Sequence, residues 1–149
     1  MTSYRIVLAE DHVPLRQIIK KIVQGTGALT VVGEANDGLG ILKILEQSLP
    51  DMVITDISMP RLEGLEASKQ IKELYPQIKV LILTLHGEKD YLYQAMLHGV
   101  NGYILKEDMD QELYSAIQAV RRGRGYISHS LKHIFHRLPW AHGIPNISL

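Results

Sequence analysis

Five side chains that could bind a cation or contact a phosphoryl group stand at the ends of apolar runs in this sequence. Glu10 and Asp11 directly follow one run, and Asp56 follows a second. Thr84 and Lys106 come at the ends of two later runs. In open parallel sheets, the carboxyl ends of the strands form the edge at which ligands bind. We therefore expect these five side chains to meet at one edge of a sheet.

Three carboxylates at one edge need a compensating charge. Two carboxylates about 4 Å apart repel by about 4 kcal/mol at an effective dielectric constant near 20. A bound cation removes this cost, and a ligand set made of oxygen atoms suits Mg²⁺. For any single residue, a solvated polar strand end is the better explanation. The whole set favours a Mg²⁺ site.

The segments that must position these side chains alternate between two patterns. Five short apolar runs occur at Arg5–Ala9, Thr30–Glu34, Met52–Thr55, Lys79–Leu83 and Gly102–Leu105. Three of them contain continuous apolar stretches, which are typical of strands covered on both faces, namely Ile6-Val7-Leu8, Met52-Val53-Ile54 and Val80-Leu81-Ile82-Leu83. Segments of roughly 17–23 residues separate the five runs, enough for one crossover helix each. Their apolar residues recur with helical spacing. The sequence therefore predicts an α/β fold with a doubly wound, five-stranded parallel sheet and five helices.

Composition restricts the functional class. Lys plus Arg and Asp plus Glu number 16 each, so no global charge attracts the protein to nucleic acid or to a membrane. There is no cysteine, which excludes disulfides and thiolate metal sites. No apolar run is long enough to span a bilayer. We expect a cytoplasmic protein.

The ordered set of motifs carries a resemblance to a known family. These motifs are Glu10-Asp11, Asp56-Ile-Ser-Met-Pro60, Leu83-Thr84 and Tyr103-Ile-Leu-Lys106. Together they resemble the receiver domain of bacterial response regulators in two-component signalling, over residues 4 to 122. The resemblance implies a flavodoxin-like sheet with strand order 2-1-3-4-5. The segments Val32-Gly33-Glu34-Ala35 and Ala119-Val-Arg-Arg-Gly123 are most similar to the subfamily with a helix-turn-helix (LuxR-type) output domain.

The resemblance implies a phosphoacceptor and a metal site. Asp56 would accept a phosphoryl group from the phosphohistidine of a sensor histidine kinase. Asp11 and Asp56 would bind Mg²⁺, with Glu10 acting directly or through water. The backbone carbonyl of Ser58 would complete the protein ligands. The chain would be a phosphorelay signalling module that assists its own phosphorylation and dephosphorylation, and not a conventional enzyme.

The resemblance also implies a switch. Lys106 would contact the acyl phosphate, and Thr84 would donate its hydroxyl to a phosphoryl oxygen. Tyr103 would then change rotamer to fill the space that Thr84 leaves, altering the face formed by the fourth helix and the fifth strand and helix. Two departures from the family pattern are Glu107, where many receivers have a proline, and the large Leu85 after Thr84.

The chain divides into a receiver domain at residues 1–122 and a C-terminal linker or tail at 123–149. The tail should contain a short amphipathic helix with the apolar residues Leu131, Ile134, Phe135 and Leu138. We expect this helix to dock on a second copy of the chain, as a homodimer. The 27 residues after Arg122 are too few for a helix-turn-helix domain, so we expect no direct DNA binding.

Several alternatives remain open at this point. The chain could be a shortened form of a DNA-binding transcription regulator. In the full-length protein its target would then be its own output domain, which is missing here, rather than a separate downstream protein. It could be a degenerate receiver used only for dimerisation, although the intact site argues against this. A phosphatase with an aspartate nucleophile, or a flavin carrier, could use the same fold, but Glu10 and Asp11 would repel a flavin phosphate. We expect His86 to be a solvated loop residue.

Overall fold

The apolar runs form the strands of one parallel sheet in the computed structural model, which describes residues 3–25, 27–138 and 147–148. The strands are β1 (Tyr4–Ala9), β2 (Leu29–Ala35), β3 (Met52–Thr55), β4 (Lys79–Thr84), β5 (Gly102–Leu105), β6 (Gly125–Ile127) and β7 (Ile147–Ser148). Their order is β2-β1-β3-β4-β5-β6-β7, with every neighbouring pair parallel. The expected parallel sheet and the order 2-1-3-4-5 of its first five strands are confirmed.

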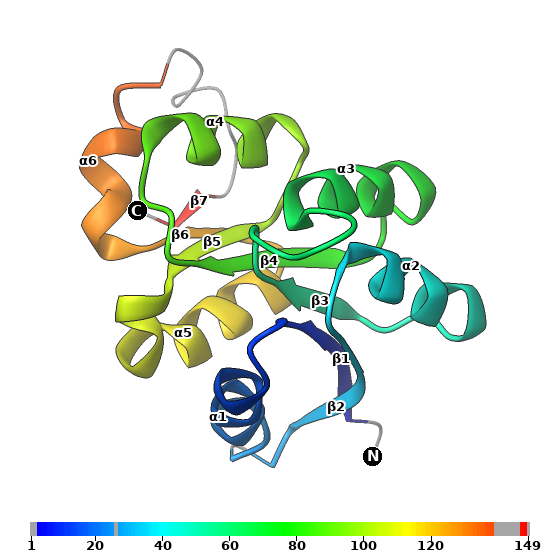
Figure 1. Ribbon diagram of the computed structural model, residues 1–149. Coiled ribbons are helices and arrows are strands. Elements are labelled where there is room, and N and C mark those ends of the chain that lie inside the picture. Colours follow the sequence, from blue (N-terminus) through cyan, green and yellow to red (C-terminus); the bar gives the residue numbers. More distant parts are fainter. Residues whose placement is uncertain (1–2, 26, 139–146, 149) are drawn as a thin grey trace.

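Helices cover both faces of the sheet (Figure 1). They are α1 (Val13–Gln24), α2 (Gly38–Gln47), α3 (Gly64–Leu74), α4 (Lys89–Leu97), α5 (Met109–Arg121) and α6 (Lys132–Phe135), with single 3₁₀ turns η1 (Lys106–Asp108) and η2 (His129–Leu131). Helices α2, α3 and α4 lie on one face, and α1 and α5 lie on the other. Among the described residues, no helix is both long and apolar enough to cross a membrane.

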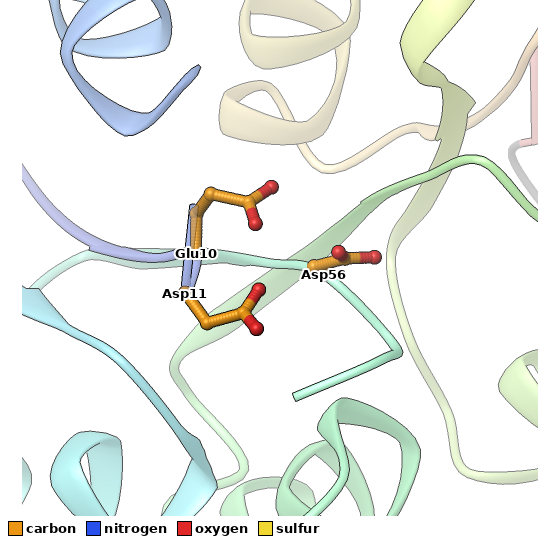
Figure 2. Close-up of side chains that lie close together, drawn as sticks. All are labelled: Glu10, Asp11 and Asp56. Carbon is orange, nitrogen blue, oxygen red and sulfur yellow. The ribbon is translucent and has the colours of Figure 1, made fainter. Parts of the chain in front are cut away.

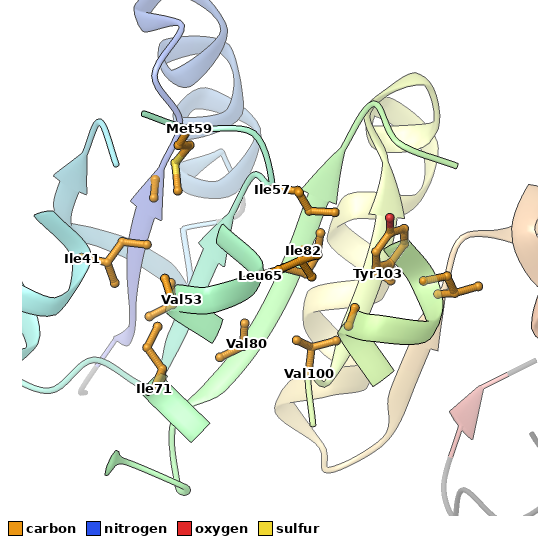
Figure 3. Close-up of a cluster of buried hydrophobic side chains, with 14 of the residues drawn as sticks. Ile41, Val53, Ile57, Met59, Leu65, Ile71, Val80, Ile82, Val100 and Tyr103 are labelled. Atoms are coloured by element: carbon orange, nitrogen blue, oxygen red, sulfur yellow. The ribbon is translucent and has the colours of Figure 1, made fainter. Parts of the chain in front are cut away.

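The two faces explain why the strands are apolar without alternation. Val53 belongs to the hydrophobic cluster under α2, α3 and α4, whereas its neighbours Met52 and Ile54 belong to the cluster under α1 and α5. Figure 3 shows part of the first cluster, in which Leu65 and Ile71 of α3 lie beside Ile82 and Val53 of the sheet. Burying both faces removes apolar surface from water, which stabilises the fold by about 25 cal/mol per Å² of buried apolar area. The packing also fixes the position of each strand end.

The expected count of five strands and five helices was wrong. After α5 the chain adds β6 to the free edge of β5, with Tyr103 opposite Ile127, and β7 follows on β6. The one-turn helix α6 adds to the helix count. An edge strand presents unpaired backbone N–H and C=O groups. Here β6 pairs with the exposed edge of β5. A strand of three residues that begins with Gly125 gives too little pattern to be predicted.

The segment from 125 to 138 packs on its own receiver fold. Leu131, Phe135 and Leu138 are buried, and they belong to the same hydrophobic cluster as Leu92 of α4. Figure 1 shows α6 beside α4 and beyond the edge of β5. These apolar side chains are therefore already covered, and the expectation that they dock on a second copy was wrong. Trp140, the single tryptophan of the chain, belongs to the same tail but lies outside the described residues.

Candidate functional site

The carboxyl ends of β1 and β3 bring three carboxylates together. The register of these strands pairs Ala9 with Thr55, so the residues that follow stand side by side. One side-chain oxygen from each of Glu10, Asp11 and Asp56 lies within 4.8 Å of the other two. Figure 2 shows the side chains of Glu10 and Asp11 directed toward the side on which Asp56 lies. Glu10 and Asp56 are buried, whereas Asp11 is exposed, so the cluster is open to solvent on one side.

Lys106 lies among these carboxylates. Its Nζ atom is 2.8 Å from Oδ2 of Asp56 and 2.6 Å from Oε1 of Glu10. Burial lowers the pKa of Lys106, but the hydrogen bonds and negative charges of Asp56 and Glu10 outweigh it and raise that pKa above its usual value. Burial raises the pKa of Glu10, against the opposing effect of the Lys106 ammonium. The ammonium therefore partly offsets the crowded negative charge.

The residues present fit a small divalent cation. The cluster offers only oxygen atoms, and its three carboxylates outnumber its one ammonium, so the site keeps a net negative charge. Oε1 of Glu10 is fully buried, and within the described part of the chain its contact is the Lys106 ammonium rather than a hydrogen bond of regular geometry. A cation held beside Asp11 would reduce the repulsion that remains. The carbonyl of Ser58 remains a predicted fourth ligand.

The loop after Asp56 is held tightly against the site. The backbone N–H of Ile57 donates to Oδ1 of Asp56 at 2.6 Å, which orients the carboxylate. Gly64 begins α3, and its N–H donates to the carbonyl of Ile57 at 2.8 Å. A Cβ atom on Gly64 would lie 1.7 Å from the backbone oxygen of Asp56, so only glycine fits there.

A second contact fixes the same loop to the start of α2. Arg61 has a φ of 65°, the one positive φ of a non-glycine residue in the described chain. Its guanidinium binds the buried carboxylate of Asp37, with Nε 2.6 Å from Oδ2. Asp37 also caps α2 by accepting from Gly40, and Gly38 donates to the carbonyl of Leu62 at 3.0 Å. These contacts stabilise a strained loop conformation next to Asp56.

The expected switch residues lie at the same edge of the sheet. Thr84 is fully buried at the end of β4, and its hydroxyl accepts from the N–H of His86 at 3.2 Å. Tyr103 on β5 is also fully buried, and its hydroxyl donates to the carbonyl of His86 at 2.6 Å. Burial raises the pKa of Tyr103. In this structure Tyr103 therefore already occupies an inward rotamer.

His86 is the residue that sequence reasoning undervalued. Its side chain is not simply solvated: Nε2 lies 2.7 Å from the hydroxyl of Ser58, and the ring packs on Tyr91 of α4 with centroids 4.5 Å apart. With the backbone contacts to Thr84 and Tyr103, His86 joins the loop after Asp56 to α4. The only sign of a role for His86 in the sequence was its position two residues after Thr84. That position did not indicate which residues it would contact.

The site can be compared with known families now that its geometry is described. The family model of the response regulator receiver domain matches residues 6–118. The chain belongs to this family. The expected signalling class is thereby confirmed, and the alternatives of a phosphatase and a flavin carrier lose their basis.

The relatives of this receiver are regulatory proteins. It is 36% identical over 119 residues to the uncharacterized transcriptional regulatory protein YxjL of Bacillus subtilis (strain 168), covering 80% of this chain and 55% of YxjL. It is 40% identical over 124 residues to the oxygen regulatory protein NreC of Staphylococcus carnosus (strain TM300), covering 83% of this chain and 57% of NreC. The chain thus spans just over half the length of these relatives.

A solved structure supports the subfamily resemblance. The crystal structure of a LuxR-family two-component response regulator from Aurantimonas sp. SI85-9A1 matches with a TM-score of 0.85 and 28% identity. The match covers 89% of this chain and 94% of that chain. The two departures from the receiver pattern leave the site intact: Glu107 lies in the turn η1, and the side chain of Leu85 is largely exposed.

Proposed function

We propose that this receiver accepts a phosphoryl group on Asp56, with Mg²⁺ bound by Asp11, Asp56 and Glu10 and by the carbonyl of Ser58. The observation that carries the proposal is the position of the Asp56 carboxylate. It lies within ion-pair distance of the Lys106 ammonium and in a cluster of three carboxylates that offers oxygen ligands to a cation. A nucleophile, a fixed positive charge and a metal site are the parts that phosphoryl transfer requires.

The transfer is a displacement at phosphorus. An oxygen of Asp56 forms the new P–O bond while the P–N bond of a phosphohistidine breaks, and the electron pair of that bond returns to the imidazole of the donor. The product is an acyl phosphate on Asp56. Bound Mg²⁺ supplies positive charge that offsets the charge of the transferring group.

The residues of the chain orient and stabilise this reaction. Ile57 N–H holds Oδ1 of Asp56, which fixes the direction of the carboxylate before transfer. Lys106 places a positive point charge next to Oδ2 of Asp56. This charge stabilises the negative charge that develops on the phosphoryl oxygens during transfer. Thr84 donates its hydroxyl to a phosphoryl oxygen. The same hydroxyl oxygen accepts from the N–H of His86, so a movement of Thr84 is passed to His86.

The output is a change in the face next to β5. Movement at Thr84 disturbs His86, and through His86 it affects Tyr103 and the start of α4. The donor is a sensor histidine kinase in the cytoplasm, and the chain is a signalling module rather than a conventional enzyme. Because its relatives are regulators about twice its matched length, the signal passes to an output domain or to a separate downstream protein.

The proposal is tested by phosphorylation with acetyl phosphate and Mg²⁺ followed by intact mass measurement. We expect the addition of one phosphoryl group to the wild-type chain and none to Asp56→Asn. Asp90→Asn, which changes an exposed carboxylate on α4, serves as the matched control and should be labelled normally. Labelling of Asp56→Asn, or its absence in the wild type, would contradict the proposal.

A further inference from the structure

Ser128 is a fully buried polar residue outside all the motifs that define the site. It directly follows β6, in the segment that comes after the receiver match. Its backbone N–H donates to the carbonyl of Tyr103 at 2.9 Å, and its hydroxyl accepts from the N–H of Leu105 at 3.1 Å. Ser128 therefore binds the backbone of β5 at the residue directly before Lys106.

The same hydroxyl also binds the chain after Lys106. It donates to Oδ2 of Asp108 at 2.7 Å, in the turn η1. A single buried hydroxyl thus connects Leu105 on one side of the lysine to Asp108 on the other. It uses both its donor and its acceptor capacity in doing so.

Hydrophobic contacts hold Ser128 in this position. Ile127 before it and Leu131 after it are buried, and Phe135 of α6 is buried in the same cluster. The segment from 125 to 138 is therefore anchored on both sides of the serine. A rigid anchor can transmit its position to the backbone that it binds.

We propose that Ser128 is a positioning residue for Lys106, so that the segment from 125 to 138 completes the phosphoacceptor site. The inference rests on the role proposed for Lys106 in phosphoryl transfer. A lysine side chain is a flexible stem with a point charge at its end, so its reach depends on where its backbone is fixed. Here the ammonium must contact Asp56 and Glu10 together, and small displacements at a reacting centre have large effects on rate.

A purely structural serine would satisfy Leu105 and Asp108 without affecting the lysine. The two roles are separated by a double-mutant cycle on Ser128→Ala and Lys106→Ala, read as the initial rate of phosphorylation by acetyl phosphate at saturating Mg²⁺. We expect Ser128→Ala to lower the rate by about tenfold in the wild-type background, the effect of roughly one lost hydrogen bond. In the Lys106→Ala background it should cause no further loss.

Two further variants keep the test independent of a folding defect. Ser130→Ala removes an exposed hydroxyl that binds the same Oδ2 atom of Asp108 at 2.8 Å, and it should leave the rate unchanged. Asp108→Ala removes one partner of Ser128 but leaves the bond from Leu105, and it should lower the rate by a smaller factor. Circular dichroism would confirm that each variant is folded at the assay temperature.

The outcomes separate this inference from the proposed function. Absence of phosphorylation in the wild type would remove the proposed function and this inference with it. Normal phosphorylation of both the wild type and Ser128→Ala would overturn the inference alone. An equal fold-loss in the two backgrounds would also overturn it, because the serine would then act without the lysine.

Discussion

Nζ of Lys106 lies 2.8 Å from Oδ2 of Asp56, although 50 residues separate the two in the chain. The ammonium follows the end of β5 and the carboxylate follows the end of β3, and β4 lies between these two strands in the sheet. In this arrangement the lysine neutralises part of the charge that a cation would otherwise neutralise. Lys106 and a bound cation should therefore oppose each other in binding, and under the proposed function they would cooperate in phosphoryl transfer.

The first prediction concerns this opposition. Lys106→Ala should raise the affinity for Mg²⁺ several-fold, because it removes a positive charge from beside two carboxylates. The same variant should phosphorylate more slowly, because the charge next to Asp56 is lost. Isothermal titration with Mg²⁺ measures the first effect, with the exposed Lys89→Ala as the control. A lower Mg²⁺ affinity in Lys106→Ala would contradict the electrostatic argument.

The second prediction concerns the exposed carboxylate of the cluster. Asp11→Asn should weaken Mg²⁺ binding by at least about tenfold, the cost of losing even an outer partner of a metal site. It should change the free energy of unfolding little in the absence of metal, because Asp11 is exposed. Thermal unfolding with and without Mg²⁺ separates the two quantities. Equal stabilisation of variant and wild type by Mg²⁺ would remove Asp11 from the ligand set.

The third prediction concerns pH and the cost of the buried acid. Burial raises the pKa of Glu10 above its ordinary value of 4.5, so the folded protein holds this proton more tightly than the unfolded chain. The stability from Glu10 is therefore fully present below pH 4.5 and is lost as the pH rises through its folded pKa. Glu10→Gln mimics the protonated form. It should raise the metal-free unfolding free energy at pH 7, because the buried negative charge is removed.

This gain should disappear when the pH is lowered, and Mg²⁺ should stabilise the variant less than the wild type. Denaturant unfolding at pH 4 and pH 7, each with and without Mg²⁺, gives the unfolding free energy of variant and wild type under all four conditions. A variant less stable than the wild type at pH 7 without metal would show that the Glu10–Lys106 contact outweighs the cost of burial.

The fourth prediction concerns the loop that holds Asp56. Gly64→Ala places a Cβ atom against the backbone oxygen of Asp56, so the loop must move. We expect a loss of about 3–5 kcal/mol in unfolding free energy and weaker Mg²⁺ binding. Gly87→Ala is the matched control, because a Cβ there meets only ordinary contacts at 3.6 Å or more and Gly87 also lies near the site. Similar stability of both variants would refute the steric argument.

The central strands and the site residues could be predicted because their signals are strong and local. The run Met52–Thr55 is buried on both faces, its first three residues are apolar, and Asp56 follows directly. The structure brings together the three carboxylates, Lys106 and Thr84, as the sequence predicted from the shared edge of the sheet. Their chemical roles remain predictions.

The missed features depend on partners that leave no periodic pattern. Strand β6 is defined by its hydrogen bonds to β5, not by its own three residues. Ser128 and His86 are polar residues whose contacts come from distant parts of the chain, so the sequence around them gives no indication of burial. The apolar spacing of Phe135 and its neighbours did predict a helix face, but periodicity does not say which surface covers it.

The last prediction concerns that face. Phe135 is fully buried on the chain itself, within the cluster that contains Leu92 of α4. Phe135→Ala should lower the unfolding free energy of the monomer by about 3–5 kcal/mol, the usual cost of removing a buried phenylalanine ring. His133→Ala changes an exposed residue on the same helix and should have little effect. Denaturant unfolding at two protein concentrations distinguishes the two ways of covering the ring, because only a ring buried between two copies makes the loss depend on concentration. A loss of unfolding free energy that depends on protein concentration would show that the Phe135 ring is buried at an interface between two copies.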